Sequence, residues 1–251
     1  MGASPPQLAG LFPRPSSKLL PRGWAGLLLC CLALSQWACS DSSKFPAPID
    51  TNNPISSELP TYLSAVDFGI SKPSPEVRQV ANGILRARDQ GVHDFFIIDK
   101  RLARLYVFSV NGMLRGESAI LLGSARGDDS VPGIGTRPLQ QVRPHERTTP
   151  AGRFVAERGQ NLDGEDIVWV DYDAAVSMHR VRAKVSKERR LERLSTPSAR
   201  DNRISFGCVN IPTQFYEAVV SPTFARSNAV VYILPEVNPL QQAFSFDISR
   251  K

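Results

Sequence analysis

Residues 94–123 read DFFIIDKRLARLYVFSVNGMLRGESAILLG, and this stretch predicts the start of a β-rich domain. Residues 94–98 form a short apolar run rich in strand-forming side chains, and residues 102–110 partly alternate between apolar and polar. Asn111-Gly112 follows directly, and this pair is a strong hairpin signal because both central positions of the tight turn favour positive φ. Residues 113–122 are then expected to form the returning strand.

Residues 74–91 are predicted to form an N-terminal helical segment upstream of this hairpin, with helical spacing from Glu76 to Arg88. Ser74 suits the N-cap and Pro75 the first helical position. Apolar side chains recur at helical spacing from Val77 to Leu85, and Gly91 lies just beyond the expected end. One amphipathic helix is therefore expected to precede the domain.

Downstream of the hairpin, loop and strand patterns follow one another. Residues 123–149 hold many glycines and prolines and predict a long surface loop. Residues 167–170 (IVWV) and 229–234 (AVVYIL) predict strands, and residues 212–220 predict a short helix. The pattern indicates a mainly β domain, a sandwich or open barrel with a few short helices, rather than alternating βαβ units.

The composition restricts the partners of this chain. It has 251 residues, 42% of them hydrophobic, and a formal net charge of +6. That length fits one domain with tails, and a basic surface favours nucleic acid, anionic lipid or anionic cell-wall polymer. Residues 180–193 hold the densest cluster of basic side chains, and no stacking aromatic side chains are interleaved there. We therefore expect no nucleic-acid partner.

The first 39 residues have the layout of a secretory signal. Arg14, Lys18 and Arg22 precede an uncharged stretch with the apolar centre GWAGLLLCCLAL, and small residues follow around Ala38. This centre is short for a span of about 20 residues, although an uncleaved membrane anchor is the alternative. The signal predicts an exported protein of the periplasm or cell envelope, whose only membrane contact is its N-terminus.

Two further features follow from this region. Cys39 could carry a lipid after cleavage, although Gln36 occupies a position at which a lipid-modification site usually has an aliphatic residue. Residues 40–73 are rich in Ser, Pro and Asn without periodicity, and they predict a linker between the signal and the domain.

The four cysteines are unevenly distributed. Cys30, Cys31 and Cys39 lie in the leader, so Cys208 is the only cysteine of the body and has no intrachain disulfide partner. Two interpretations stay open for it, namely a buried small hydrophobe and a reactive thiol. The three histidines lie far apart, and the body has no cluster with metal-ligand spacing, so we expect no metal and no other cofactor.

Cys208 lies in the segment RISFGCVNIP, residues 203–212. Gly207 permits a sharp backbone conformation next to the thiol and leaves N–H groups that could face an oxyanion. A cysteine nucleophile also needs a base, and the candidates are His93, His145 and His179. By default each of these is an ordinary surface or core histidine.

Three segments resemble the L,D-transpeptidase (YkuD-like) family. Residues 205–210 (SFGCVN) are similar to its signature Ser/Thr-His-Gly-Cys-apolar-Asn/Arg, and residues 149–154 (TPAGRF) to its Thr-Pro-x-Gly-x-Phe/Tyr segment. The opening hairpin resembles the start of that domain, and His179 occupies the place of its first catalytic histidine. The resemblance implies a catalytic domain over residues 92–236, followed by a tail at 237–251.

The resemblance also implies a function. The implied function is that of a peptidoglycan L,D-transpeptidase, which forms a thioester with a stem tetrapeptide, releases D-alanine and transfers the acyl group to an amine. An envelope protein is one candidate for the amine acceptor. The alternatives are an L,D-carboxypeptidase on the same substrate and a catalytically silent peptidoglycan-binding protein. The implied roles are nucleophile for Cys208, general acid/base for His179, oxyanion or support for Gly207 and Ser205, and substrate binding for Arg203 and Asn210.

Two departures from the family pattern stand out. Phe206 replaces the histidine of the signature, which could alter thiol orientation or acceptor choice. Residues 187–202 form an insertion that starts with KERRLER and is expected to be partly helical. It is either a solvated surface excursion or a basic lip, in which Arg189, Arg190 or Arg193 would contact substrate carboxylates.

Overall fold

The computed structural model describes residues 65–248. The predicted signal, Cys39 and residues 40–64 of the predicted linker therefore lie outside the described residues. None of the helices found in residues 65–248 is long and apolar enough to cross a bilayer.

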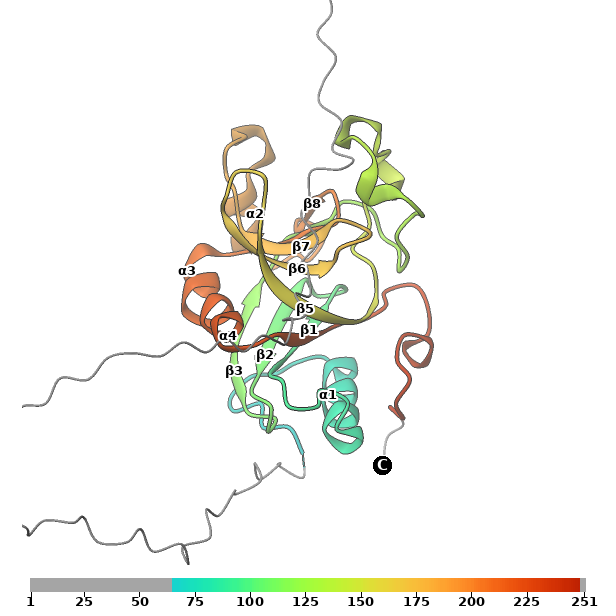
Figure 1. The fold of residues 1–251 in the computed structure, drawn as a ribbon, viewed down its shortest axis with the longest axis vertical. Helices are drawn as coiled ribbons and strands as arrows, with labels where there is room; N and C mark the ends of the chain where they lie inside the picture. The colour runs from blue at the N-terminus through green and yellow to red at the C-terminus, as the bar shows by residue number, and fades with distance from the viewer. Residues whose placement is uncertain (1–64, 249–251) are drawn as a thin grey trace, which may run out of the picture. The chain divides into compact units, whose positions relative to one another are not determined.

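The described part is mainly β, a nearly closed eight-stranded mixed barrel with short helices (Figure 1), so the predicted fold class is confirmed in its barrel form. The sheet order is β3-β2-β1-β10-β5-β6-β7-β9, and a backbone bridge between Leu121 and Asn210 joins the chain after β3 to β9. A second, two-stranded sheet pairs β4 with β8. The strands are β1 (Phe95–Asp99), β2 (Arg104–Phe108), β3 (Leu114–Ala119), β4 (Leu122–Gly123), β5 (Gly152–Gln160), β6 (Asp166–Asp171), β7 (Val176–Arg180), β8 (Arg203–Ser205), β9 (Val209–Ile211) and β10 (Ala229–Ile233).

Strand β1 is buried on both faces, which explains its unbroken apolar sequence. Phe96 and Ile98 belong to the barrel core. Their neighbours Phe95 and Ile97 belong to a second core, shared with helix α1 (Pro75–Ala87), because successive strand residues point to opposite faces. The segment assigned above to the tail contributes Phe244 and Ile248 to this second core.

Helix α1 begins at the predicted cap, and its C-cap is Arg88 rather than a residue next to Gly91. The Ser74 hydroxyl accepts a hydrogen bond from the Val77 N–H at 3.3 Å, and Pro75 occupies the first turn. The helix ends where Arg88, the last residue of the predicted helical spacing, adopts a left-handed conformation with φ 52°, three residues before Gly91. Gly91, at φ 61°, lies in the following turn instead.

The predicted hairpin is present, but its turn differs from the expectation. Of the two predicted residues only Gly112 has positive φ, at 92°, and Asn111 does not. The Ser109 N–H donates to the Met113 carbonyl, and the Gly112 N–H donates to the Ser109 carbonyl, both at 2.9 Å. The turn is therefore centred on Val110 and Asn111, with Gly112 as the left-handed residue that follows.

The other predicted elements are found close to their expected places. Strand β6 covers the run IVWV, and β10 covers the run AVVYIL except its last residue, Leu234. The predicted short helix is α3 (Thr213–Phe215), which continues through a wider turn (Tyr216–Val220) into α4 (Ser221–Arg226). The long loop contains three short 3-10 turns, Ile134–Thr136, Leu139–Gln141 and Pro144–Glu146.

Candidate active site

Two parallel strands bring the candidate nucleophile and base together. His179 lies on β7, and Cys208 directly precedes β9. The register pairs Met178 with Val209 and His179 with Asn210. Because neighbouring strands lie about 4.8 Å apart, this register places the imidazole next to the thiol although 29 residues separate them.

The Cys208 thiol is half-buried, and its contacts with Ser177 and Ala175 are long. The Ser177 hydroxyl donates to Sγ at 3.6 Å, and the thiol donates to the Ala175 carbonyl at 3.6 Å. Sequence reasoning missed Ser177. The signal that could have found it is the period of two in a strand, which places Ser177 on the same face of β7 as His179.

The surroundings favour the thiolate of Cys208. Burial by itself would raise the pKa of this thiol, but a hydrogen bond from His179 and the positive charge of its imidazolium lower the pKa. The N–H and hydroxyl of Ser177 act in the same direction. The net result is a pKa below the ordinary value of a cysteine, which increases the fraction of reactive thiolate near neutral pH.

The tautomer of His179 is fixed by its strand neighbour. Nδ1 lies 2.7 Å from the Arg180 carbonyl oxygen. Because a carbonyl only accepts, Nδ1 carries a proton in both charge states of the ring, and Nε2 is the nitrogen left to exchange a proton with the thiol. The side-chain Nδ2 of Asn210 lies 3.5 Å from Nε2.

Ser205 supports the turn before the thiol rather than the thiol itself. Its hydroxyl donates to the Cys208 carbonyl at 2.6 Å and accepts from the Gly207 N–H at 3.1 Å. The Gly207 N–H is therefore already engaged, so it does not fit the oxyanion role that the sequence suggested for it. Gly207 adopts φ 137°, and an added Cβ would lie 2.8 Å from the Thr148 carbonyl oxygen.

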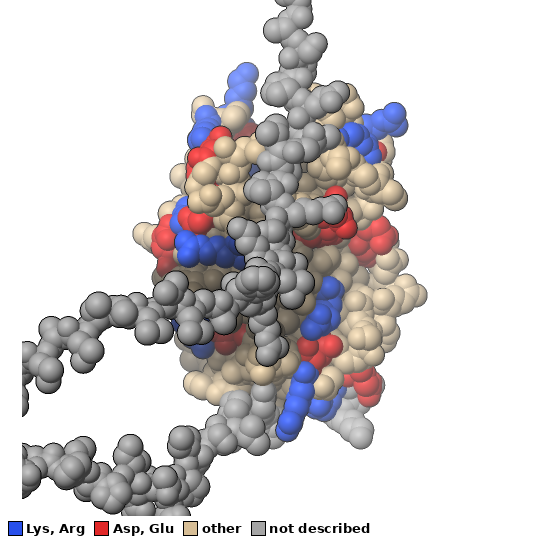
Figure 2. Space-filling view, in the orientation of Figure 1, with Lys and Arg blue, Asp and Glu red and all other residues tan. Residues whose placement is uncertain are grey.

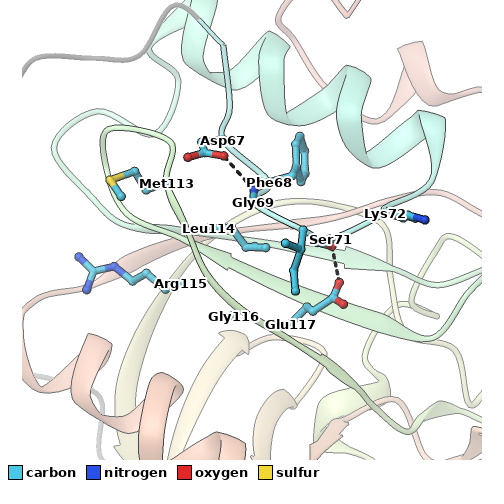
Figure 3. Close-up of a pocket in the computed structure, with 11 residues that line it drawn as sticks. Asp67, Phe68, Gly69, Ser71, Lys72, Met113, Leu114, Arg115, Gly116 and Glu117 are labelled. Atoms are coloured by element: carbon cyan, nitrogen blue, oxygen red, sulfur yellow. Dashed lines mark hydrogen bonds between the residues drawn. The ribbon is translucent and has the colours of Figure 1, made fainter.

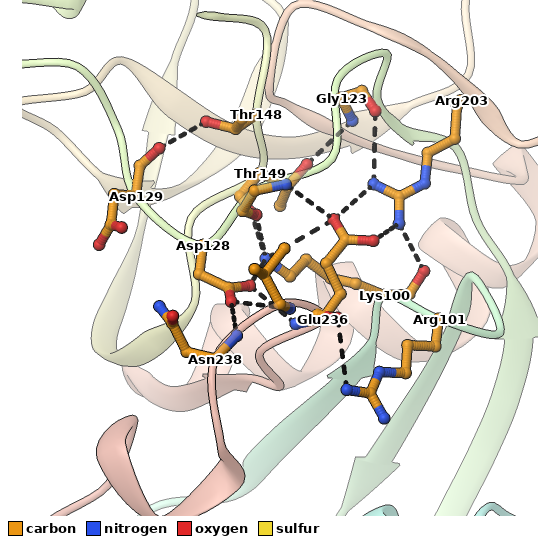
Figure 4. Close-up of polar contacts among 12 residues, drawn as sticks. Lys100, Arg101, Gly123, Asp128, Asp129, Thr148, Thr149, Arg203, Glu236 and Asn238 are labelled. Carbon is orange, nitrogen blue, oxygen red and sulfur yellow. Dashed lines mark hydrogen bonds and ion pairs between the residues drawn. The ribbon is translucent and has the colours of Figure 1, made fainter. Parts of the chain in front are cut away.

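Arg203 does not lie at the thiol. Its guanidinium pairs with Glu236 at 2.5 Å and donates to the Lys100 carbonyl at 2.7 Å. Lys100 is fully buried and pairs with Asp128 at 2.7 Å (Figure 4). Burial lowers the pKa of Lys100, while its bond to Asp128 opposes that effect. Because both cations have buried acidic partners, Arg203 fits a structural role and not the expected substrate-binding role.

Asn210 is fully buried, and its amide is used internally. Nδ2 donates to the Cys208 carbonyl at 3.3 Å, and Oδ1 accepts from Arg190 Nη1. The structure thus brings Asn210 to the site, but as a support for Cys208 and His179 rather than as an exposed ligand for substrate.

Phe206 lies two positions before Cys208 in the chain and is 37% exposed. The guanidinium carbon of Arg147 lies 3.9 Å from the centre of the Phe206 ring, a cation–π contact. Arg147 Nε and Nη2 also donate to the Val142 carbonyl, at 3.3 and 3.2 Å. The phenylalanine that replaces the signature histidine therefore packs against Arg147, a cation from the end of the long loop.

The predicted insertion contains a short 3-10 turn, Ser186–Glu188, and helix α2 (Arg190–Ser195). Arg189 is exposed and pairs with Glu192, and Arg193 donates to backbone carbonyls of the insertion itself. Arg190 reaches the site, but its contact there is Asn210.

A separate groove of about 500 Å³ lies between residues 67–72 and residues 113–117 (Figure 3). None of the candidate site residues lines it. Within residues 65–248, no group of three His, Cys, Asp or Glu side chains is arranged to hold a metal ion. Basic and acidic side chains are interspersed on the face shown in Figure 2.

Comparison with known proteins finds similarity in structure alone. No family model matches the sequence, and no curated protein matches it. The NMR structure of the L,D-transpeptidase catalytic domain from E. faecium is similar at 16% identity and TM-score 0.31, covering 57% of this chain and 98% of that one. The crystal structure of an L,D-transpeptidase from Xylanimonas cellulosilytica is similar at 13% identity and TM-score 0.35, covering 60% and 67%. Neither likeness assigns an activity to this chain.

Proposed function

We propose that this chain is a cysteine acyltransferase of the L,D-transpeptidase type that acts on peptidoglycan stem peptides outside the cytoplasm. One observation carries the proposal: His179 lowers the pKa of the Cys208 thiol. The imidazole of His179 is held in place by the bond from its Nδ1 to the Arg180 carbonyl. The ordered segments around Thr149, His179 and Cys208 support the choice of substrate, and the signal pattern at residues 1–39 supports the location.

The proposed reaction has two halves. His179 Nε2 takes the proton of the Cys208 thiol, the thiolate attacks the carbonyl carbon of the third stem-peptide residue, and a tetrahedral oxyanion forms. We assign the Cys208 N–H to this oxyanion, because Ser205 occupies the Gly207 N–H. His179 Nε2 then gives its proton to the leaving nitrogen, D-alanine departs and a thioester remains.

In the second half an acceptor amine attacks the thioester carbonyl. Nε2 takes a proton from this amine, the carbon–sulfur bond breaks, and the Cys208 thiolate is restored. Water in place of the amine would give hydrolysis with the same groups. The acceptor therefore decides between a transferase and a carboxypeptidase.

Intact-mass measurement tests the proposal. The full chain is incubated with a disaccharide-tetrapeptide muropeptide, in parallel with Cys208→Ala. An adduct on the unsubstituted protein alone, together with released D-alanine, supports it. Repeating the reaction with and without an added amine separates transfer from hydrolysis.

Phe206 favours the second candidate, a silent peptidoglycan-binding protein, because it removes the histidine of the family signature. The variant Phe206→His distinguishes the two. We expect both proteins to be acylated, because the ring of Phe206 is held by Arg147, while the proposed chemistry uses Cys208 and His179. Acylation of the variant alone would identify the natural protein as silent. Acylation of neither, with intact folding, would refute the enzyme proposal.

A further inference from the structure

We propose that Arg190, in the insertion, is a positioning residue that holds the Asn210 amide in the orientation that keeps His179 and Cys208 together. The inference rests on the proposed function only in that this pair is the reactive one. Arg190 itself touches neither the thiol nor, by our assignment, the substrate.

The geometry of Arg190 is tightly determined. It is the first residue of α2, and its side chain is 14% exposed. Nε donates to the Glu188 carboxylate at 2.6 Å, and Nη1 donates to Asn210 Oδ1. The guanidinium of Arg190 thus donates to Glu188 on one side and to Asn210 on the other. A planar guanidinium with two fixed donors has little rotational freedom left.

Hydrogen-bond chemistry then decides which way the Asn210 amide faces. A guanidinium can only donate, so the amide oxygen must face Arg190. The NH2 group consequently points to the Cys208 carbonyl at 3.3 Å and to His179 Nε2 at 3.5 Å. The reverse orientation would place the amide oxygen against a carbonyl oxygen. Arg190 therefore selects the amide orientation in which Asn210 connects Cys208 with His179.

The consequence concerns the thiol. The hydrogen bond and charge of His179 lower the pKa of Cys208, and both effects depend on the ring staying next to Sγ. In the neutral imidazole the Nε2 lone pair faces the Asn210 NH2 group, so the amide holds the ring beside Sγ before the thiol proton moves to Nε2. If the Asn210 amide is released, the ring is held less firmly beside Sγ and the thiol pKa rises. The charged or titratable groups near the thiol are His179, Arg190 with its partner Glu188, and Arg147 above Phe206. Removal of the Arg190 charge alone would also raise the thiol pKa, so the test must separate charge from orientation.

The experiment measures the rate of Cys208 alkylation by iodoacetamide against pH in the full chain, after its other thiols have been identified with a Cys208→Ala control. For Arg190→Met we expect the midpoint to move up by about half to one pH unit, a roughly threefold to tenfold slower reaction below the midpoint. Arg189→Met is the matched control, since it removes the same charge from the neighbouring position, where Arg189 pairs with Glu192 and not with Asn210.

Two further variants make the test specific. Arg190→Lys keeps the charge and one donor, so we expect it to lie between the natural protein and Arg190→Met. In an Asn210→Ala background, Arg190→Met should add little, because the amide that it orients is gone. The inference would be overturned if Arg190→Met moved the alkylation midpoint equally with and without Asn210→Ala. It would also be overturned if Arg189→Met moved the midpoint as far as Arg190→Met does, or if a folded Arg190→Met did not move it. The assay uses no peptidoglycan, so absence of acylation by tetrapeptide would refute the proposed function without deciding this one.

Discussion

The hydroxyl of Thr149 donates to the carbonyl oxygen of Gly207 at 2.8 Å, across 58 positions of sequence. The Thr149 hydroxyl oxygen also accepts a hydrogen bond from the Gly123 N–H at 2.9 Å, and Thr149 is fully buried. One hydroxyl thus joins the segment TPAGRF to the turn that carries Cys208. The Thr149 carbonyl in turn accepts from Lys100 at 2.9 Å, so the turn is anchored to the buried ion cluster of Figure 4.

Replacement of Thr149 should test this anchor. Thr149→Val keeps the shape but leaves the Gly207 carbonyl and the Gly123 N–H unsatisfied, so we expect a loss of about 2–3 kcal/mol in the free energy of unfolding. Thr149→Ser keeps the hydroxyl and should lose less than half of that. Urea unfolding of the three proteins measures the difference. Equal losses for Val and Ser would show that the methyl group, and not the hydrogen bonds, matters.

The backbone at Gly207 should tolerate no side chain. Gly207→Ala combines φ 137° with a Cβ only 2.8 Å from the Thr148 carbonyl oxygen. Gly164→Ala is the control, because Gly164 also has positive φ, at 77°, but nothing lies within 4 Å of an added Cβ. We expect about 1 kcal/mol of destabilisation at Gly164 and clearly more at Gly207, with slower Cys208 alkylation only in the latter. Thermal unfolding and alkylation rates check both points.

The contact between Cys208 and His179 should be visible in a pH profile. Since His179 lowers the thiol pKa, His179→Gln should raise it towards the ordinary value of about 8.5. Each unit of that rise reduces the thiolate fraction, and with it the alkylation rate near pH 6.5, about tenfold. His145→Gln, an exposed histidine in the long loop, is the control and should leave the profile unchanged. A profile insensitive to His179→Gln would refute the pairing.

The Asp128 carboxylate should make the fold sensitive to acid. Burial would raise its pKa, but the bond from Lys100 and the N–H groups of Asn238, Glu236 and Val237 together lower the pKa to about 2. A folded pKa below the unfolded value of about 3.9 means that the stabilisation is present above pH 4 and is lost as the pH falls towards 2. The difference between the two pKa values corresponds to about 2–3 kcal/mol of stability.

Urea midpoints at pH 6, 4 and 2.5 measure this contribution. We expect Asp128→Asn to be less stable at pH 6 and to lose less stability than the natural protein on acidification. Asp163→Asn, in an exposed turn, should behave like the natural protein. Parallel pH curves for Asp128→Asn and the natural protein would contradict the assignment.

Local patterns predicted much of the fold. The Ser74 cap, the hairpin near Gly112 and the strand runs each depend on a few neighbouring residues, whose conformational preferences are legible in the sequence. The differences from the expected elements were local as well. Arg88 ends the helix before Gly91 because a non-glycine residue adopts the left-handed conformation there, and the turn shifted by one residue because a bulge follows it.

The sequence by itself determined that the body has one thiol, next to a glycine in a recognisable segment, and His179 as a candidate partner. Only the tertiary structure decided which side chains surround them. Ser177 and Asn210 reach the pair through the β7–β9 register, Arg190 reaches Asn210 from the insertion, and Arg203 lies instead in a buried ion pair. The physical reason is that these contacts depend on non-local strand pairing and on competition for buried acidic and carbonyl partners, and no short window of sequence contains that information.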